Sequence, residues 1–268
     1  MSMKEKIETF NGETITLTFC ESGENHVGME MLGERVSIGE GFSLEDLLHI
    51  KDKLGEGELY HLNDLYKDLE MDDKEDIDSA YVLVLRNVVS KLVRDKASLW
   101  EDLLRIEWDT KYYCTRRKRV LNKHARANVC FASIDQRPDY ENKKGTIISY
   151  SSIPQIGLLR ENIERLIGEK GENMVCEGNR YFSSKCGIGF HGDSERRRVI
   201  GVRLGESMPI HWCWFKRSKA FGDKLELTLN DGDMYIMSEK AVGTDWKKRS
   251  IASLRHAAGN KKYLQEKR

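Results

Sequence analysis

The stretch that decides the fold runs from residue 174 to residue 255, where short segments of alternating apolar and polar residues follow one another. Each segment is bounded by Gly, Asp, Ser or Lys. In order they are MVCEGNRYF (174–182), GIGFHGD (187–193), VIGVRLG (199–205), PIHWCWF (209–215), KLELTL (224–229), GDMYIMS (232–238) and RSIASLR (249–255). Short strands at this spacing are typical of an all-β sandwich or barrel.

The chain before this stretch mixes helices and strands. Residues 14–20 (TITLTFC) alternate over β-branched positions and predict a half-buried strand. Ser43 precedes two acids and an apolar stripe that ends at Gly55, which predicts a helix of about three turns. Residues 80–85 predict a buried strand or the start of a helix, and residues 99–106 and 156–167 predict amphipathic helices.

Composition excludes several classes of protein. The 268 residues are 39% hydrophobic and 33% charged with 3 prolines, which argues against a disordered chain. No apolar run is long enough to span a bilayer, and residues 1–13 lack the apolar core of a signal peptide. The 6 cysteines contain no C-x-x-C pair, so we expect reduced thiols. We therefore expect a soluble intracellular protein, cytoplasmic or nuclear and not secreted, with no membrane partner.

The net charge of zero hides an asymmetry along the chain. Residues 1–80 have a balance of −14, and residues 81–268 have a balance of +14. The densest basic stretch spans residues 111–126, and a second basic run spans residues 196–198. A basic half of this kind indicates an anionic partner, and we expect nucleic acid, either DNA or RNA.

His191-Gly192-Asp193 is the motif that points to chemistry. Residues two apart on a strand face the same side, so this imidazole and carboxylate can hold two sites of one metal. Two histidines and one carboxylate around open positions are the ligand set of non-haem Fe(II) oxygenases. Two ligands alone are a weak signal, because an H-x-D triplet is common by chance.

The surrounding sequence strengthens the signal. Residues 179–195 (NRYFSSKCGIGFHGDSE) resemble the AlkB-like family of Fe(II)/2-oxoglutarate dioxygenases, in which an N-R-Y-type segment precedes H-x-D-x-E by about ten residues. Residues 249–259 (RSIASLRHAAG) are similar to the R-x5-R element of that family. The resemblance covers roughly residues 120–259.

The resemblance implies a double-stranded β-helix, or jelly roll, in the C-terminal part. We therefore predict an α+β chain with a dioxygenase-like β-helix domain over residues 109–268. The acidic residues 1–108 would form a small accessory α/β domain in front of it.

The resemblance also implies a binding site for 2-oxoglutarate. Arg249 would grip the distal carboxylate, and Arg255, on the same strand face, would lie nearer the metal-bound end. Asn179 and Tyr181 would add hydrogen bonds. Glu195 would face the substrate and could accept from the exocyclic amine of a base, although a solvated glutamate is an equal alternative.

The third metal ligand does not follow the pattern of the family, because residues 234–248 contain no histidine. Asp245 is the candidate that we place in the site beside His191 and Asp193. His211 and His256 are alternatives from other strands, and strand alternation would turn His256 away from any site that Arg255 faces. A site with no third protein ligand is a further alternative.

These residues imply oxidation that depends on Fe(II), 2-oxoglutarate and O2, with N-alkylated bases in nucleic acid as the expected substrate for demethylation. Two alternatives stay open. The first is a 2-oxoglutarate hydroxylase of a protein or a small molecule. The second is a non-catalytic nucleic-acid-binding relative with a degenerate iron site. The role of the acidic N-terminal part and the oligomeric state do not follow from the sequence.

Overall fold

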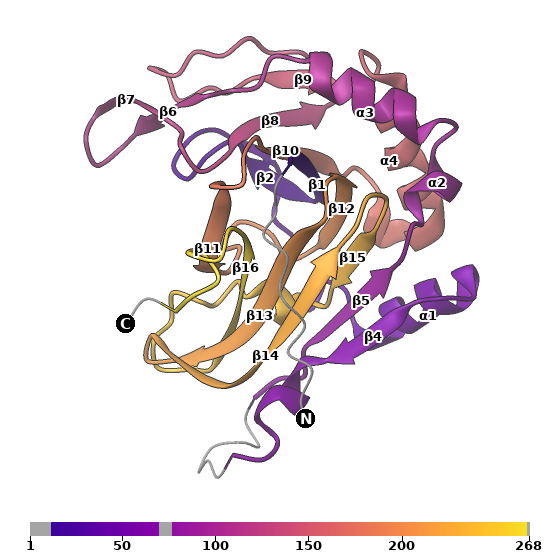
Figure 1. Cartoon of the computed structure of the whole chain (residues 1–268), viewed down its shortest axis with the longest axis vertical. Helices are drawn as coiled ribbons and strands as arrows, with labels where there is room; N and C mark the ends of the chain where they lie inside the picture. Colours follow the sequence, from indigo (N-terminus) through magenta and orange to yellow (C-terminus); the bar gives the residue numbers. More distant parts are fainter. Residues whose placement is uncertain (1–11, 70–76, 267–268) are drawn as a thin grey trace.

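Two β-sheets face each other in a computed structural model that describes residues 12–69 and 77–266 (Figure 1). The large sheet has eight strands in the order β4-β5-β15-β12-β1-β10-β8-β9. These strands are β4 (Glu58–His61), β5 (Tyr81–Leu85), β15 (Met234–Met237), β12 (Val199–Gly205), β1 (Thr14–Cys20), β10 (Val175–Tyr181), β8 (Ala127–Ala132) and β9 (Ile147–Ser149). Only β8 and β9 pair in parallel; the other pairs in this sheet are antiparallel.

The small sheet has four antiparallel strands in the order β11-β16-β13-β14. They are β11 (Gly187–His191), β16 (Ser253–Gly259), β13 (Met208–Lys216) and β14 (Lys219–Leu229). Two hairpins stand outside both sheets, formed by β2 (Ser22–Glu24) with β3 (Met31–Gly33) and by β6 (Lys111–Cys114) with β7 (Arg119–Asn122).

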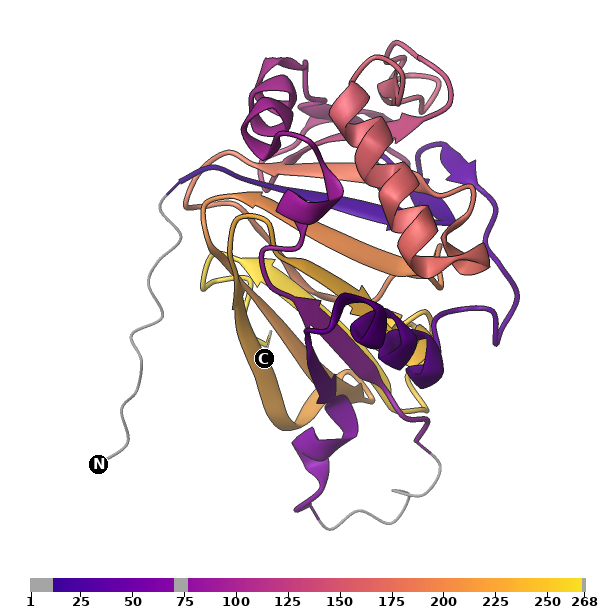
Figure 2. The same cartoon turned by 90° about the vertical axis from the view of Figure 1, so that its right-hand side faces the viewer.

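Helices cover the outer face of the large sheet (Figure 2). They are α1 (Leu44–Leu54), α2 (Val89–Leu92), α3 (Lys96–Arg105) and α4 (Pro154–Ile167), while the short α5 (Glu239–Val242) follows β15. The Ser43 side chain accepts from the Asp46 backbone N–H in a capping box, and Gly55 ends α1 in the left-handed region. The three longer helices predicted from the sequence are therefore confirmed, each within a few residues of its predicted bounds.

The apolar core has two main clusters, one on each face of the large sheet, and a small third cluster on β8 and β9. Ile15, Leu17 and Phe19 of β1 pack against the helices, together with Leu159 of α4. A second cluster, which includes Trp212 and Trp214 of β13, fills the space between the sheets. Strand β1 is therefore buried along both faces, and the prediction of a half-buried strand is wrong. Apolar and polar residues alternate along β1, so the strand has one apolar face and one polar face, and both faces are buried.

The first 108 residues contribute three strands to the large sheet, beside the small β2–β3 hairpin. Strands β1, β4 and β5 lie in the same sheet as β8, β10, β12 and β15, and β1 pairs with both β10 and β12. The large sheet therefore contains strands from both sides of the boundary predicted between residues 108 and 109. Its central strand, β1, comes from the N-terminal part. The mixed, strand-rich character of the chain is as predicted.

All six cysteines are free, and five of them are buried. Within the described residues, no helix is long and apolar enough to cross a membrane.

Candidate metal centre

Three potential metal ligands meet at the edge of the small sheet. His191 is the last residue of β11, and it pairs across the strands with His256 of β16. Asp193 follows two residues after His191, with Oδ1 3.5 Å from His191 Nε2 and Oδ2 3.9 Å from His256 Nε2. One ligand atom from each residue lies within 4.8 Å of the others. This separation allows a single ion to contact all three.

The glycine between His191 and Asp193 has a structural reason. A Cβ at Gly192 would lie 2.1 Å from the carbonyl oxygen of Gly243, so no larger residue fits without a backbone shift. The backbone N–H of Asp193 donates to the carbonyl of Val242 at 3.1 Å. The close approach of these two segments aims the Asp193 carboxylate back at the two imidazoles.

The two histidines are suited to bind a cation. His191 Nδ1 lies 2.9 Å from the carbonyl oxygen of Gly189, so the proton belongs on Nδ1 and the lone pair of Nε2 faces Asp193. Burial, together with the neighbouring His191 and Arg196, holds the pKa of His256 well below its usual range. Two imidazoles and one carboxylate are a ligand set compatible with Fe(II).

The third ligand predicted from the sequence needs correction. Asp245 does not join this group, because its Oδ2 lies 2.7 Å from Lys240 Nζ in a separate ion pair. His211 is buried with Nδ1 3.6 Å from Glu226. His256 takes the place that we gave to Asp245. Strand alternation does set His256 and Arg255 on opposite faces, but the site lies on the face of His256.

The two arginines of the R-x5-R element lie outside the cavity that adjoins these ligands. Strand β16 begins at Ser253, so Arg249 lies in the preceding turn, where its side chain is exposed. The Arg255 guanidinium stacks on the rings of Phe215 at 4.3 Å and Trp246 at 5.3 Å. The prediction that both arginines share one strand face is therefore wrong, because the strand starts four residues later than predicted.

The cavity beside the three ligands has a volume of about 500 Å³ and lies between the two sheets. Asn179 and Tyr181 of β10 line it, as the resemblance implies. Asn179 Oδ1 accepts from Arg126 Nε at 2.6 Å, and its Nδ2 donates to Glu177 Oε1 at 3.2 Å. Tyr181 is 5% exposed.

Glu195 also lines the cavity, but it is held by an arginine. Arg196 donates to Glu195 Oε1 at 2.5 Å and to Glu177 Oε2 at 2.6 Å, and its Nε lies 3.8 Å from Asp193 Oδ2. Two of the three arginines in the second basic run are thus ion-paired, since Arg197 pairs with Glu239 at 3.0 Å, while Arg198 donates to the carbonyls of Glu40 and Lys170. Arg196 thus lies among Glu177, Glu195 and Asp193, beside the three potential ligands.

Sequence reasoning missed several side chains of the cavity. Thr16, Arg203 and Tyr235 line its large-sheet wall, and Arg203 is 1% exposed. Thr16 pairs with Arg203 on one side and with Asn179 on the other, so these polar residues form a row across three strands. Side chains of β12 alternate between two faces, and Arg203 lies on the face opposite the apolar residues. That face is buried because β12 pairs with strands distant in sequence, which the local pattern does not reveal.

Residues 24–27 form another wall of the cavity. Burial, and next the charge of Glu195, raises the pKa of Glu24 to about 7. The His26 ring stacks on Tyr112 of β6 at 3.8 Å, and burial lowers the pKa of His26 to about 4. Val27, on the same wall, is 74% exposed. The β6–β7 hairpin is thereby attached to the rim of the cavity.

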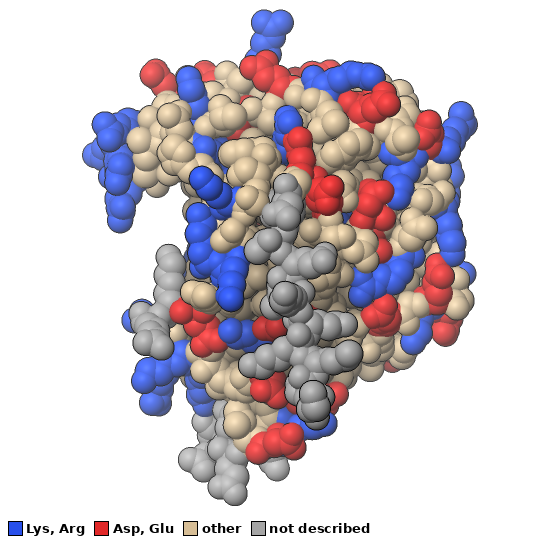
Figure 3. Space-filling view, viewed as in Figure 1, with Lys and Arg blue, Asp and Glu red and all other residues tan. Residues whose placement is uncertain are grey.

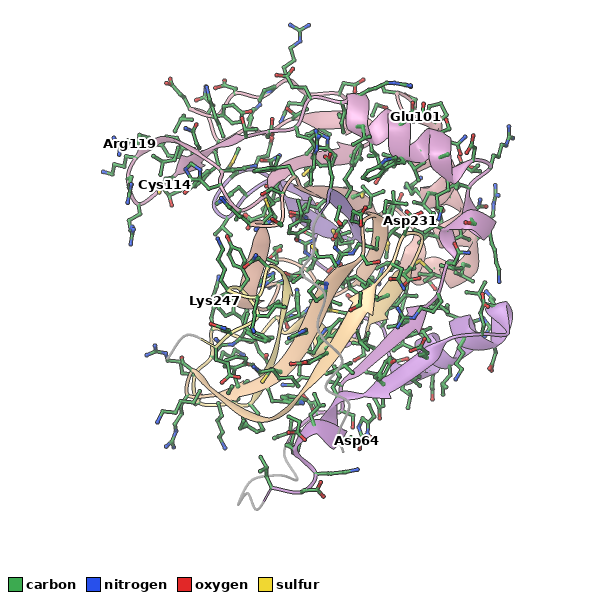
Figure 4. All side chains as sticks on the ribbon, in the orientation of Figure 1. Asp64, Glu101, Cys114, Arg119, Asp231 and Lys247 are labelled. Atoms are coloured by element: carbon green, nitrogen blue, oxygen red, sulfur yellow. The ribbon has the colours of Figure 1, made fainter. Side chains whose placement is uncertain are left out.

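Basic side chains gather on this side of the molecule. Figure 3 shows Lys and Arg along its left edge, where the surface is hollowed beneath the hairpin. Figure 4 places Arg119 at the outer end of the hairpin and Lys247, which lines the cavity, below it on the same side. Arg116, Arg117, Lys118 and Arg119 are exposed, and no carboxylate of the described residues forms an ion pair with them.

No protein-family model matches the chain. It is 44% identical over 258 residues to "Uncharacterized protein R156" of Acanthamoeba polyphaga mimivirus, and the alignment covers 94% of this chain and 98% of the relative. The chain therefore belongs to the same family as protein R156 of mimivirus.

Proposed function

We propose that the protein is an Fe(II)- and 2-oxoglutarate-dependent dioxygenase that oxidises N-alkylated bases in nucleic acid. The observation that carries this proposal is the group of His191, Asp193 and His256 at one end of a cavity between two sheets. It offers a third potential ligand where the sequence pattern lacked one. This supports an intact metal site over a degenerate one.

The arrangement of the strands supports the same proposal. Two facing sheets with a ligand-lined cavity between them are compatible with a double-stranded β-helix, which we propose as the fold. In this fold, His191 and His256 come from neighbouring strands of the small sheet, and Asp193 comes from the turn after β11. Rigid strands hold the two imidazoles in register, and the bond from the Asp193 N–H to the Val242 carbonyl fixes the turn.

The cavity suits an anionic co-substrate. Arg126 and Arg203 line the wall formed by the large sheet, together with amide and hydroxyl groups. A dicarboxylic 2-oxo acid needs a metal for its oxo-acid end and a fixed cation for its other carboxylate. The cavity offers both within one volume.

Nucleic acid is the substrate that the charges favour. The exposed cations of the β6–β7 hairpin lie on the same side of the molecule as Lys247, which lines the cavity (Figure 4). Cations of this kind bind a phosphate backbone without regard to sequence. A base in a duplex would have to be flipped out, or presented in a single strand, to reach ligands inside the cavity.

Each side chain of the site has a defined task. Fe(II) held there would supply the activation of O2 for an oxidation in which one oxygen atom goes into succinate, formed with CO2 from 2-oxoglutarate, and the other into an N-methyl group that is released as formaldehyde. His191, Asp193 and His256 would hold the metal. Arg196 neutralises the acids behind the centre, and Glu195 and Glu24 offer acceptors toward a bound substrate.

The test is succinate formation from 2-oxoglutarate by anaerobically iron-loaded protein, started with air. His191→Ala should abolish turnover, whereas Asp245→Ala should leave it within about threefold of wild type, since Asp245 is held by Lys240. Turnover in the His191→Ala protein would contradict the proposal. Turnover that methylated oligonucleotides do not stimulate would favour the hydroxylase of a protein or a small molecule.

A further inference from the structure

Two basic segments that are distant in sequence meet at one end of the small sheet. Arg217 and Ser218 form the tight turn between β13 and β14, and both adopt the left-handed conformation, with φ of 53° and 64°. The backbone N–H of Arg217 donates to the carbonyl oxygen of Arg249 at 2.9 Å, which joins this turn to the loop before β16. We call the exposed cations of the joined segments the turn–loop surface: Arg217, Lys219, Lys247, Lys248 and Arg249.

The turn–loop surface has no acidic partners of its own. Among the residues that the structure describes, no carboxylate forms an ion pair with any of these five cations. Like charges gathered in two adjoining segments repel one another, so the fold gains no stability from bringing them together. An anion from outside the chain would remove this repulsion.

Arg255 adjoins this surface and is affected by its charge. The Arg255 guanidinium stacks on the rings of Phe215 at 4.3 Å and Trp246 at 5.3 Å, and its Nη2 donates to the Trp246 carbonyl oxygen at 3.3 Å. Burial, and next the charge of Arg249, lowers the pKa of Arg255 from its usual range. The two arginines of the R-x5-R element therefore belong to one cationic region, and neither of them lines the cavity.

Trp246 connects the turn–loop surface to the metal centre. Its side chain lines the cavity, and its Nε1 donates at 3.0 Å to the Oγ of Ser194, the residue after the potential ligand Asp193. Lys247 lines the same cavity, with Nζ 5.7 Å from the centre of the Trp246 ring. The turn–loop surface therefore continues outward from one wall of the cavity.

The β6–β7 hairpin adjoins a different wall. Tyr112 of the hairpin stacks on His26, which lines the cavity together with Val27. Figure 4 shows Arg119 at the outer end of the hairpin and Lys247 below it on the same side of the molecule. In Figure 3, Lys and Arg side chains gather both above and below the hollow on this side. The cavity thus has a basic surface beside each of two walls.

We propose that the turn–loop surface binds the phosphate backbone of a nucleic-acid strand on one side of the base that enters the cavity, while the hairpin binds the backbone on the other side. This inference rests on the proposed function for its choice of nucleic acid, and it needs no metal. It gives Arg249 a task that its exposed position allows. Two linked contacts hold one strand more tightly than either contact alone.

The test fixes the position of the strand by its modified base. Two single strands of about 12 nucleotides, within the range of single-strand site sizes, carry one N-methylated adenine at the 5′ end or at the 3′ end. With that base in the cavity, each strand can extend toward only one of the two basic surfaces. Fluorescence anisotropy gives their affinities for Mn(II)-loaded protein without 2-oxoglutarate, so no product forms.

Two variants with the same change of net charge are compared. The surface variant keeps Lys247, which lines the cavity, and carries Arg217→Glu, Lys219→Glu, Lys248→Glu and Arg249→Glu. The control variant reverses exposed charges on the helical side of the molecule and carries Lys91→Glu, Arg94→Glu, Arg105→Glu and Arg165→Glu. Exposed substitutions usually change stability little, so both variants should melt within a few degrees of wild type. If charge reversal perturbs the fold, glutamine replaces glutamate at the same positions.

The surface variant should bind one of the two strands at least about 10-fold more weakly than the control variant does, and the other strand within about threefold. The slope of log affinity against log salt should flatten for the affected strand alone, by about 0.7 for each lost phosphate contact. Charge reversal on the hairpin should weaken the opposite strand. Equal effects of the surface variant on both strands, or no effect on either, would overturn the inference.

An acidic peptide of equal charge tests the choice of partner. It should compete poorly with the strand for wild-type protein. If it competes as well as an unmodified oligonucleotide does, the inference is wrong, because the turn–loop surface would then suit an acidic protein.

Failure of the proposed function gives a different result. If wild type does not prefer the methylated strands, or binds no Mn(II), the proposed function fails at its substrate or at its metal. An unmodified strand then decides on the turn–loop surface alone. The surface variant should bind it at least about 10-fold more weakly than the control variant, and equal affinities would overturn the inference.

Discussion

The two walls of the cavity carry opposite kinds of side chain. The small-sheet wall presents the imidazoles of His191 and His256, with Asp193 beside them. The large-sheet wall presents Arg203 and Thr16, and within the described residues neither the Arg203 Nε nor the Thr16 Oγ1 has a hydrogen-bond partner. We propose that one wall would receive a cation and the other an anion. A single ligand that chelates the metal and ends in a carboxylate would satisfy both.

The comparison between the walls extends to their arginines. Arg196, behind the metal ligands, is surrounded by acids, whereas Arg203, across the cavity, is surrounded by hydroxyl groups. Burial alone therefore does not distinguish a structural arginine from one that binds a ligand. The groups that contact the guanidinium distinguish them.

The largest expected effect separates these two arginines by stability. Arg196→Met should lower the free energy of unfolding by about 3–5 kcal/mol, because it leaves Glu177 and Glu195 without their buried cation. Arg203→Met should cost less than about 1 kcal/mol, since no ion pair is lost. Urea denaturation followed by circular dichroism measures both. Equal losses would mean that Arg203 has a structural partner after all.

The metal-binding wall is tested by its third ligand. His256→Ala should weaken Mn(II) binding by at least about 100-fold, more than substitutions in the residues around metal ligands usually cost. Asp245→Ala is the matched control and should stay within about threefold of wild type, because Lys240 already neutralises it. Titrations followed by electron paramagnetic resonance give both affinities. The reverse pattern would restore the ligand set predicted from the sequence.

The rim of the cavity is tested by charge reversal on the hairpin. Changing Arg116, Arg117, Lys118 and Arg119 to Glu should weaken binding of a single-stranded oligonucleotide by at least about 10-fold. The slope of log affinity against log salt should flatten by roughly 3, which is about 0.7 for each lost phosphate contact. Arg105→Glu and Arg165→Glu on the helices are controls and should change little. Unaltered binding by the hairpin variant would exclude the hairpin as the nucleic-acid contact.

The smallest expected effect concerns Glu24 and pH. Because the pKa of Glu24 is raised from 4.5 to about 7, the folded state holds a proton that the unfolded state loses first. Stability should therefore fall as the pH rises from about 4.5 to about 7, by roughly 1 kcal/mol after allowance for solvent screening. Glu24→Gln should flatten this dependence in urea denaturation curves. If the pH dependence of stability is the same in Glu24→Gln as in wild type, a group other than Glu24 causes it.

Local patterns were enough to predict part of each wall. The spacing of His191 and Asp193 at the end of β11, and the shared face of Asn179 and Tyr181 on β10 of the large sheet, depend on neighbours in sequence. The capped helix after Ser43 was predictable for the same reason. Short-range geometry of strands and helix caps fixes these positions.

The remaining features depend on which distant strands pair. His256 joins the site because β16 lies beside β11 with His191 opposite it, and no local pattern contains that register. Arg203 faces a cavity and not solvent because β1, from the N-terminus, pairs with β12. The wrong placement of Arg249 and Arg255 has the same origin, since a spacing of six residues puts two side chains on one face only while the strand lasts.

The most direct test of the account is a crystal structure of the protein with Fe(II) and 2-oxoglutarate, grown without oxygen and recorded at the iron absorption edge. The account predicts one anomalous peak within bonding distance of His191, Asp193 and His256, with the remote carboxylate of 2-oxoglutarate on Arg203. Iron coordinated by Asp245, or a co-substrate whose remote carboxylate contacts Arg249 or Arg255, would contradict it.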